Sequence, residues 1–579
     1  MAIKTATAGA PAAEAPSITA GGAVLARLKA VGVDYIFANS GTDFPPIIEG
    51  LAEASAKDIA LPQAIVIPHE HAAMGMAHGY YLATGRAQAV MAHTNVGLAN
   101  CAIGAINAAT ENVPVLLFSG RTPVTERGRL GTRTVPIGWG QEMRDQAALV
   151  REATKWDYEL RFPEQALDVI DRAYAIANST PKGPVYLSLP REVLCEPCPS
   201  VGLEARSRMS PAVAAPQPEA LEAAAKLIVG AKCPLIIAQR GAGSAEGFAT
   251  LAALAEAWGI PVSQYWAVQL AIASDHPMSV GSNPKNWLKD ADVVIVIDSL
   301  APWSPDAHEV PDSCKVIQIG QDPLYSRFPV RNFRADVSLV GEATHILGDL
   351  AARLRSSLSE TTAMREARRD RVAAAHRDWR DKVCRQAEAG NGNPMTKAWV
   401  SKCLSEAIAG QDATVLSELG VPLDPLTLDR HNSWYQEPHS GGLGWSFPCA
   451  LGMQLAGRDR LIVATMGDGS YMFSNPVACH QIAEAMKLPV LVLVLNNSEW
   501  GAVRHSVLDV YPRGFASKTN KMPLVSLDPS PDFTKIAEAS RAFTIKVEKG
   551  DDLPAALGRA IEHVRTRRTQ ALIEISIAP

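Results

Sequence analysis

The sequence predicts an α/β protein made of three doubly wound domains, each built around a parallel sheet. Short apolar runs of strand length alternate with longer helical stretches along most of the chain. A parallel sheet with crossover helices produces this alternation. It occurs in three regions, at residues 19–195, 219–352 and 395–579. A chain of 579 residues is long enough for three such domains.

The first region follows an Ala- and Pro-rich stretch, residues 1–18, that we expect to be a disordered tail. Its apolar runs predict five strands, at residues 35–38, 64–67, 87–92, 114–120 and 184–189. Amphipathic or small-residue stretches predict helices at residues 20–31, 72–84 and about 98–110. This region is therefore expected to form one complete sheet with its own helices.

The second region, residues 219–352, shows strand patterns at residues 234–238, 293–297 and 315–319. The turn Arg240-Gly241-Ala242-Gly243 lies between a strand and a helix. Such a turn occurs both in nucleotide-binding loops and in plain α/β connections, so both readings stay open. The densely charged stretch 356–392 predicts a solvated helical linker to the third region.

The third region, residues 395–579, predicts strands at residues 414–417, 461–466, 489–495, 543–547 and 571–575. One strand ends at Gly467-Asp468-Gly469-Ser470, and the strand after the following helix ends at Asn496-Asn497. Consecutive parallel strands end at the same edge of a sheet, so Asp468 and Asn497 are expected to meet there. A carboxylate and an amide oxygen beside a glycine turn suit Mg²⁺ held against a diphosphate.

Composition excludes several classes of function. The formal net charge of −5 gives no basic footprint for nucleic acid. No apolar run approaches the roughly 18 residues of a membrane helix, and the N-terminal residues lack the pattern of a secretory signal. The odd number of nine cysteines, scattered through a large chain, fits a reducing compartment. We therefore expect a cytoplasmic protein.

The two strand-end motifs resemble those of thiamine diphosphate enzymes. More specifically, the chain from about residue 20 onward resembles the family of acetolactate synthase, pyruvate oxidase and benzoylformate decarboxylase. Three more segments match in the family's order: PHEHAAMGMAHGYYLATG (68–85), ENVPVLLFSG (111–120) and SGGLGWSFPCALG (440–452). The resemblance implies a pyrimidine-binding domain at 19–195, a central domain at 219–352 and a diphosphate-binding domain at 395–579.

The resemblance also implies roles at the cofactor. Glu70 stands where the family's glutamate hydrogen-bonds the aminopyrimidine and shares its proton. Leu443 would prop the cofactor into a bent shape, with Gly441 supplying a carbonyl group to the pyrimidine. The motif residues Gly467, Gly469 and Ser470 would lie against the diphosphate. The metal ligands would be the side chains of Asp468 and Asn497 and the backbone carbonyl of Glu499.

One departure from the acetolactate synthase pattern lies within this motif. The interval from Asp468 to Asn497 is two residues longer, and we expect the extra residues in the turn YMFSNP (471–476). The strand ends should still meet.

The substrate side resembles benzoylformate decarboxylase more than acetolactate synthase. His93 precedes Thr94-Asn95-Val96-Gly97, where acetolactate synthases carry a Ser-Gly-Pro-Gly turn. A histidine near the reactive carbon can supply a proton after decarboxylation. His276 matches a second histidine segment, although a core or capping role remains the alternative for both histidines. The substrate pocket is expected to include Thr42, His93, Trp445 and Trp500.

The expected activity is thiamine diphosphate- and Mg²⁺-dependent cleavage or formation of a carbon–carbon bond in a 2-oxo acid. Decarboxylation would be followed by release of an aldehyde or by carboligation to a second carbonyl compound. One alternative is an acetolactate synthase or pyruvate oxidase relative with FAD or ADP in the central domain; another is a catalytically silent scaffold. In this family the cofactor lies between the first domain of one subunit and the third of another, which implies a dimer that packs as a tetramer.

Overall fold

The computed structural model describes residues 17–359, 362–519 and 522–578. The tail expected at residues 1–18 lies outside the described residues except for its last two positions. The chain forms two compact units. The first comprises residues up to 77, 85–179 and 183–212, and the second comprises residues 78–84, 180–182 and 213 onward.

The first unit is built on a six-stranded, fully parallel sheet in the order β3-β2-β4-β5-β7-β6. Its strands are β2 (Tyr35–Ala38), β3 (Gln63–Val66), β4 (Gln88–Ala92), β5 (Val115–Arg121), β6 (Asp157–Glu159) and β7 (Val185–Pro190). Its helices are α1 (Ala20–Ala30), α2 (Pro45–Ala56), α4 (Thr94–Thr110), α5 (Ile137–Gly140), α6 (Ala166–Asn178) and α7 (Arg191–Cys195), and α3 (Glu70–Thr84) begins in it. A short antiparallel pair, β1 (Ser17–Thr19) and β8 (Pro197–Pro199), joins its two ends. Sequence patterns predicted all the sheet strands except β6, which is short and polar.

Two helices on this sheet cross at glycines. A Cβ on Gly21 of α1 would lie 2.3 Å from the carbonyl oxygen of Pro46 in α2. The guanidinium of Arg27 in α1 donates to both carboxylate oxygens of Asp171 in α6, at 2.5 and 2.6 Å, and both side chains are buried. A buried charge is tolerated because it is paired and fully hydrogen-bonded. These contacts fix α1 against its neighbours.

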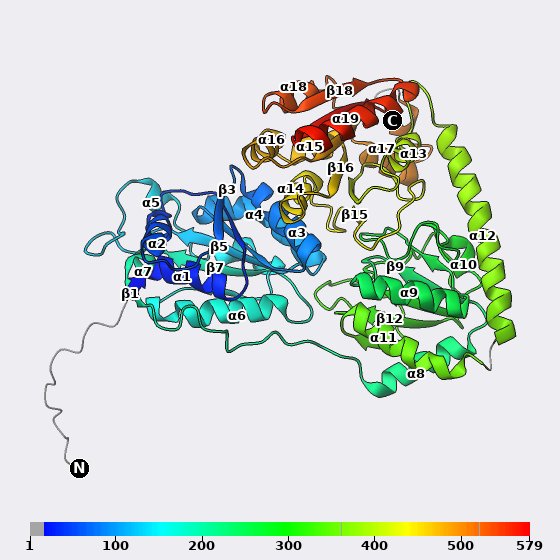
Figure 1. The fold of residues 1–579 in the computed structure, drawn as a ribbon, viewed down its shortest axis with the longest axis horizontal. Helices are drawn as coiled ribbons and strands as arrows, with labels where there is room; N and C mark the ends of the chain where they lie inside the picture. Colours follow the sequence, from blue (N-terminus) through cyan, green and yellow to red (C-terminus); the bar gives the residue numbers. More distant parts are fainter. Residues whose placement is uncertain (1–16, 360–361, 520–521, 579) are drawn as a thin grey trace, which may run out of the picture. The chain divides into compact units, whose positions relative to one another are not determined.

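The second unit contains a central sheet of five parallel strands in the order β10-β9-β11-β12-β13. The strands are β9 (Pro234–Ala238), β10 (Val262–Ser263), β11 (Val293–Ile297), β12 (Lys315–Gly320) and β13 (Val337–Val340). The accompanying helices are α8 (Pro218–Gly230), α9 (Ala245–Trp258), α10 (Lys285–Leu288), α11 (Ala343–Leu354) and α12 (Thr362–Glu388). The charged stretch predicted as a helical linker thus contains α12, which runs past α9 towards α13 (Figure 1).

The same unit contains a C-terminal sheet of six parallel strands in the order β15-β14-β16-β17-β19-β18. The strands are β14 (Ala413–Glu418), β15 (Trp434–Gln436), β16 (Leu461–Gly467), β17 (Leu491–Asn496), β18 (Phe543–Val547) and β19 (Ala571–Ser576). The helices are α13 (Lys397–Ala407), α14 (Ser446–Ala456), α15 (Asp468–Phe473), α16 (Pro476–Ala485), α17 (Gly501–Val510), α18 (Phe533–Glu538) and α19 (Leu553–Arg567). The predicted fold class, three parallel-sheet α/β domains, is confirmed.

Within the three described stretches, no helix combines the length and the apolar character that crossing a membrane demands.

Candidate active site

A cavity of about 480 Å³ lies at the carboxyl edge of the C-terminal sheet, where β16 and β17 end. Among the predicted site residues, the following line it: Leu443, Gly467, Asp468, Gly469, Ser470, Asn497, Glu499 and Trp500. The two strands are neighbours in register, with Gly467 opposite Leu495. The turn in which we expected two extra residues separates α15 from α16, with Asn475 at a φ of 54°. The strand ends therefore meet despite the longer connection.

Asp468 is the first residue of α15, and its side chain is almost entirely buried. Its Oδ2 atom has no hydrogen-bond partner among the described residues. Burial raises the pKa of this carboxyl to about 6, and backbone amides, including that of Gly469, oppose the shift. A buried, unpartnered carboxylate oxygen beside a cavity is unfavourable in the bare protein and fits a cation ligand.

Two nearby groups complete an oxygen-rich donor set. The Oδ1 atom of Asn497 accepts from the backbone N–H of Glu499 at 3.1 Å and, as an amide oxygen, has a second lone pair to offer. The Glu499 carboxylate faces Arg504 Nη1 at 3.3 Å. Its backbone carbonyl accepts from Gly501 N at 2.9 Å and can accept once more. One carboxylate, one amide and one carbonyl suit Mg²⁺, which takes oxygen ligands.

The glycine turn is covered by an aromatic ring. A Cβ on Gly469 would lie 2.3 Å from Cζ3 of Trp500, so only glycine lets the indole approach this backbone. The ring also meets Phe473 edge-on, with centroids 5.8 Å apart. Trp500 lines the cavity and forms one of its apolar walls.

A buried acid that sequence analysis missed holds the loop carrying Leu443. Glu418 ends β14 and is fully buried, and its carboxylate accepts from the backbone N–H groups of Gly444 at 2.5 Å and Ser446 at 2.7 Å. Burial raises the pKa of Glu418 to about 7, and these backbone donors oppose the shift. Gly444 has a φ of +87°, which favours glycine. An acidic residue directly at a strand end was the only sequence signal for this role.

Two residues of that loop do not line the cavity at Asp468. Trp445 was predicted to shape the substrate pocket, but its side chain is 2% exposed and does not line the cavity at Asp468. The bonds from Glu418 to both neighbours of Trp445 fix the loop in a conformation that buries the indole. Gly441 lines a separate cavity of about 370 Å³, together with Gln239 and Ala301 beyond the ends of β9 and β11.

In the first unit, Glu70 begins α3 and is 4% exposed. Its Oε1 accepts from Nδ2 of Asn39 at 2.9 Å, and its Oε2 accepts from Nδ2 of Asn100 at 3.0 Å. A Cβ on Gly97 would lie 2.7 Å from Oε1, so glycine makes room for the carboxylate. Each oxygen can accept one further hydrogen bond. Glu70 is thus a fixed carboxylate, held by two amides, with acceptor capacity left over.

His93 is paired with a buried aspartate that the sequence did not reveal. Its Nδ1 lies 2.5 Å from Oδ1 of Asp43, and its Nε2 lies 3.1 Å from Nε2 of Gln141. The hydrogen bond with Asp43 raises the pKa of His93, while burial opposes the rise. A Cβ on Gly120 would lie 1.6 Å from Oδ2 of Asp43, and one on Gly41 would lie 2.2 Å from Nδ1 of His93. The pair is therefore packed into a space that two glycines provide.

The remaining predicted residues have other surroundings. Thr42 is exposed, and its carbonyl oxygen accepts from Arg191 at 3.0 Å. The Nδ1 of His276 accepts from the backbone N–H of Met278 at 3.1 Å, and its Nε2 lies 3.9 Å from Glu256. Burial lowers the pKa of His276. These are the contacts of a histidine that stabilises a turn, so we leave it out of the site proposed below.

The Arg240 turn is explained by packing. Gly241 and Gly243 have φ values of +69° and +89°, and a Cβ on Gly243 would lie 2.5 Å from Oγ1 of Thr344 in α11. The Arg240 guanidinium stacks on the ring of Tyr325, 5.2 Å from its centroid. The glycines are thus required whether or not a nucleotide binds at this turn.

Comparison with known proteins identifies the domains. Residues 18–149 match the model of the thiamine pyrophosphate enzyme N-terminal TPP binding domain. Residues 221–350 match the central domain of the same enzymes, and residues 424–575 match their C-terminal TPP binding domain.

Relatives of similar length match nearly the whole chain. The chain is 27% identical over 551 residues to a Pseudomonas aeruginosa protein described as "Probable 2-ketoarginine decarboxylase", covering 93% of this chain and 90% of that protein. It is 27% identical over 571 residues to sulfoacetaldehyde acetyltransferase of Alcaligenes xylosoxydans xylosoxydans, covering 91% and 89%. A 4-hydroxybenzoylformate decarboxylase from Rhodococcus jostii RHA1 shares the fold, with a TM-score of 0.77, 22% identity and coverage of 97% and 99%. The chain therefore belongs to the thiamine pyrophosphate enzymes and carries their three domains in order.

Proposed function

We propose that this protein is a thiamine diphosphate- and Mg²⁺-dependent enzyme that decarboxylates a 2-oxo acid. The remaining fragment is released as an aldehyde or joined to a second carbonyl compound. When bound, thiamine diphosphate supplies a nucleophilic carbon and an electron sink for cleaving the bond next to a carbonyl. The observation that carries the proposal is the buried, unpartnered Oδ2 of Asp468 beside a cavity in the C-terminal TPP binding domain.

In this proposal the cavity at Asp468 holds the metal and the diphosphate. Asp468 and Asn497 coordinate Mg²⁺ by side chain, and Glu499 does so through its backbone carbonyl. Gly469 and Ser470 lie against the diphosphate, and Leu443 supports the organic part of the cofactor from the apolar side. Trp500 covers the glycine turn and excludes water from one side of the cavity.

In this proposal, Glu70 and His93 transfer protons. Glu70, oriented by Asn39 and Asn100, exchanges a proton with the aminopyrimidine ring. His93, which Asp43 favours in its protonated form, donates a proton to the fragment left after CO₂ departs. The decarboxylase names of two of the relatives support this direction.

The assembly we propose is a homodimer packed as a tetramer, in which Glu70 of one subunit serves the same site as Asp468 of another. The proposal rests on the family's arrangement and on the preference of soluble oligomers for closed symmetry. Sedimentation analysis of the active enzyme tests it, and an active monomer would exclude it. We also propose a cytoplasmic location, because all nine cysteines are free thiols, as in reducing compartments.

The proposed activity is tested by measuring CO₂ release from a panel of 2-oxo acids, with and without aldehyde acceptors. The names of the relatives suggest 2-ketoarginine and 4-hydroxybenzoylformate as 2-oxo acids for this panel, together with sulfoacetaldehyde as a further carbonyl compound. Glu70→Gln should abolish turnover while leaving the fold intact, since the amide preserves the shape of the side chain. Glu49→Gln, an exposed substitution in the same unit, is the matched control and should retain full activity. Full activity of Glu70→Gln would remove Glu70 from the mechanism.

A second candidate is a relative of acetolactate synthase or pyruvate oxidase with FAD or ADP in the central domain. The cavity of about 370 Å³ lined by Gln239 and Ala301 favours it, because ligands of doubly wound sheets bind outside the carboxyl ends of the strands. A visible absorption spectrum of the purified protein tests for flavin, and mass spectrometry of a denatured sample tests for ADP.

A further inference from the structure

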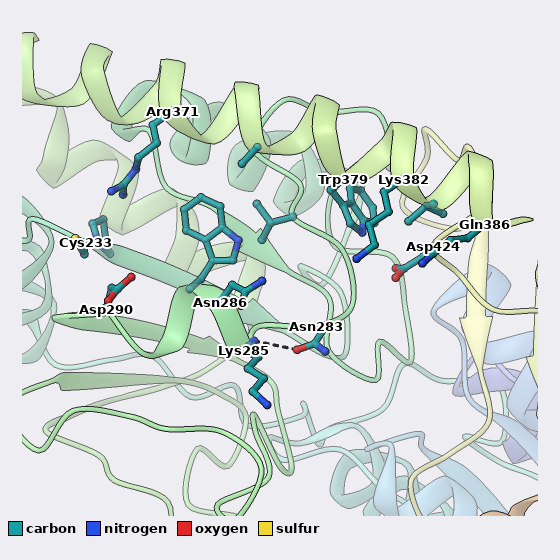
Figure 2. Close-up of a pocket in the computed structure, with 15 residues that line it drawn as sticks. Cys233, Asn283, Lys285, Asn286, Asp290, Arg371, Trp379, Lys382, Gln386 and Asp424 are labelled. Atoms are coloured by element: carbon teal, nitrogen blue, oxygen red, sulfur yellow. Dashed lines mark hydrogen bonds between the residues drawn. The ribbon is translucent and has the colours of Figure 1, made fainter.

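A third cavity, of about 650 Å³, lies beneath α12 and apart from the residues of the candidate active site (Figure 2). One wall is a single face of α12, with these residues at intervals of three or four: Arg371, Ala375, Trp379, Lys382 and Gln386. This face extends over about 22 Å, because each helical residue adds about 1.5 Å. The opposite wall contains Cys233 and the segment from Asn283 to Asp290. The cavity is elongated and has the volume of a ligand site.

The wall carries more positive than negative charge. Arg371 and Lys382 project from α12 towards the segment that contains Lys285, whereas the Lys285 side chain itself points away from α12 (Figure 2). Among the described residues, no carboxylate forms an ion pair with any of these three cations. The two lining acids are Asp290 and Asp424, and the latter already accepts from Ser282, at 3.1 and 2.8 Å. An anion between α12 and this segment would therefore find two cations, Arg371 and Lys382, that lack carboxylate partners.

Two tryptophans provide flat apolar surfaces in the same cavity. Trp287 lies under the Arg371 guanidinium, 5.8 Å from the ring centroid, and is partly exposed. Trp379 is seated on the backbone of Gly281, which has a φ of +79°; a Cβ there would lie 2.4 Å from Cζ2 of the indole. The indole thus has a fixed position rather than a free surface rotamer. Indole faces stack on planar rings, and nucleobases use such platforms.

We propose that this cavity binds a nucleotide or a nucleotide-containing coenzyme. Its phosphates pair with Arg371 and Lys382. Its base stacks on one of the two indoles, and the side-chain amides of Asn283, Asn286 and Gln386 hydrogen-bond its polar edges. The cavity lies beside Cys233 and Pro234, where β9 begins. It is therefore at the opposite end of that strand from the Arg240 turn.

The experiment is titration calorimetry on the holoenzyme, saturated with thiamine diphosphate and excess Mg²⁺ so that the active site is filled. ATP and ADP are the probes, and adenosine and inorganic tripolyphosphate serve as the two halves of the ligand. We expect ATP to bind and each half to bind more weakly. Arg371→Gln and Lys382→Gln should each weaken ATP binding about 3- to 10-fold, the range for losing one charged contact in a solvent-facing site. Trp379→Leu should weaken the binding of adenosine and of ATP alike, whereas Trp379→Phe should largely preserve the binding of both.

Arg377→Gln is the matched control, because Arg377 is an exposed arginine of the same helix that does not line the cavity. It should leave the affinity unchanged. The proposal is overturned if none of the probes binds at millimolar concentration, or if Arg371→Gln and Lys382→Gln bind ATP as the native protein does. It is also overturned if Arg240→Gln abolishes binding while the α12 variants retain it, since that result places the nucleotide at the other end of β9.

Discussion

Replacing Asp468 by asparagine should stabilise the metal-free protein and abolish its metal-dependent cofactor binding. Burial raises the pKa of Asp468 from 3.8 to about 6. Between these two values the folded state holds a proton that the unfolded state has lost, so stability falls as the pH rises through this window. Above pH 6 both states are ionised, and the full penalty of the buried charge persists.

The magnitude follows from the pKa difference. One pKa unit corresponds to about 1.4 kcal/mol, so the shift to about 6 opposes folding by about 3 kcal/mol at pH 8. At pH 5, where the folded carboxyl is mostly protonated, the same relation leaves about half of that penalty. The amide introduced by Asp468→Asn would carry no charge at either pH. The atom at the Oδ2 position has no hydrogen-bond partner in either protein, so the cost of burying it without a partner largely cancels in the comparison.

The assay is thermal unfolding of the native protein and Asp468→Asn between pH 5 and 8, without metal and then with Mg²⁺ and thiamine diphosphate. Without metal, the variant should melt at a higher temperature, and its advantage should grow with pH. With both ligands, the native protein should gain stability and the variant should not, since binding to the folded state alone stabilises it. A variant that is less stable at pH 8 without metal, or that still binds the cofactor tightly with Mg²⁺, would refute the reasoning.

Three further substitutions test separate parts of the site. Gly469→Ala places a methyl group within 2.3 Å of the Trp500 ring, so we expect at least tenfold weaker cofactor binding by calorimetry; native affinity would contradict that packing. Asp43→Asn should lower the pKa of His93 and so move the alkaline limb of the kcat/KM profile to lower pH. If the limb does not move, His93 is not the group whose titration produces it. Glu418→Gln leaves one of the backbone donors at residues 444–446 facing an amide NH₂, which should destabilise the protein by about 1–3 kcal/mol in denaturant unfolding. An unchanged midpoint would show that the loop does not depend on this carboxylate.

The predicted elements depended on local patterns. Apolar runs and their spacing predicted the three parallel sheets because burial on both faces of a strand leaves a continuous apolar signature in the sequence. Within the three parallel sheets, the strands missed were β6, β10, β13 and β15, with two to four residues each. A run of that length is too short to show a period, and pairing with a longer neighbour stabilises it.

The strand-end motif could also be recognised from the sequence, because chain connectivity brings the ends of consecutive parallel strands together. Asp468 and Asn497 therefore line one cavity as expected. The hydrogen-bond partners of Glu70 could not be predicted from the sequence. Its partners Asn39 and Asn100 are 31 and 30 residues away, on opposite sides in the sequence, and asparagine alone carries no signature of such a role.

By itself, then, the sequence determined the fold class, the family and the placement of Asp468 and Asn497 at one edge of a sheet, since these follow from periodicity and from motifs within single strand–turn segments. Only the tertiary structure decided which side chains tune them. His93 acquired a carboxylate partner 50 residues away in Asp43. Glu418 fixed a loop 26 residues away and thereby buried Trp445. Such pairings arise when distant segments pack together, and the pKa of each group then depends on burial and neighbours that no local pattern specifies.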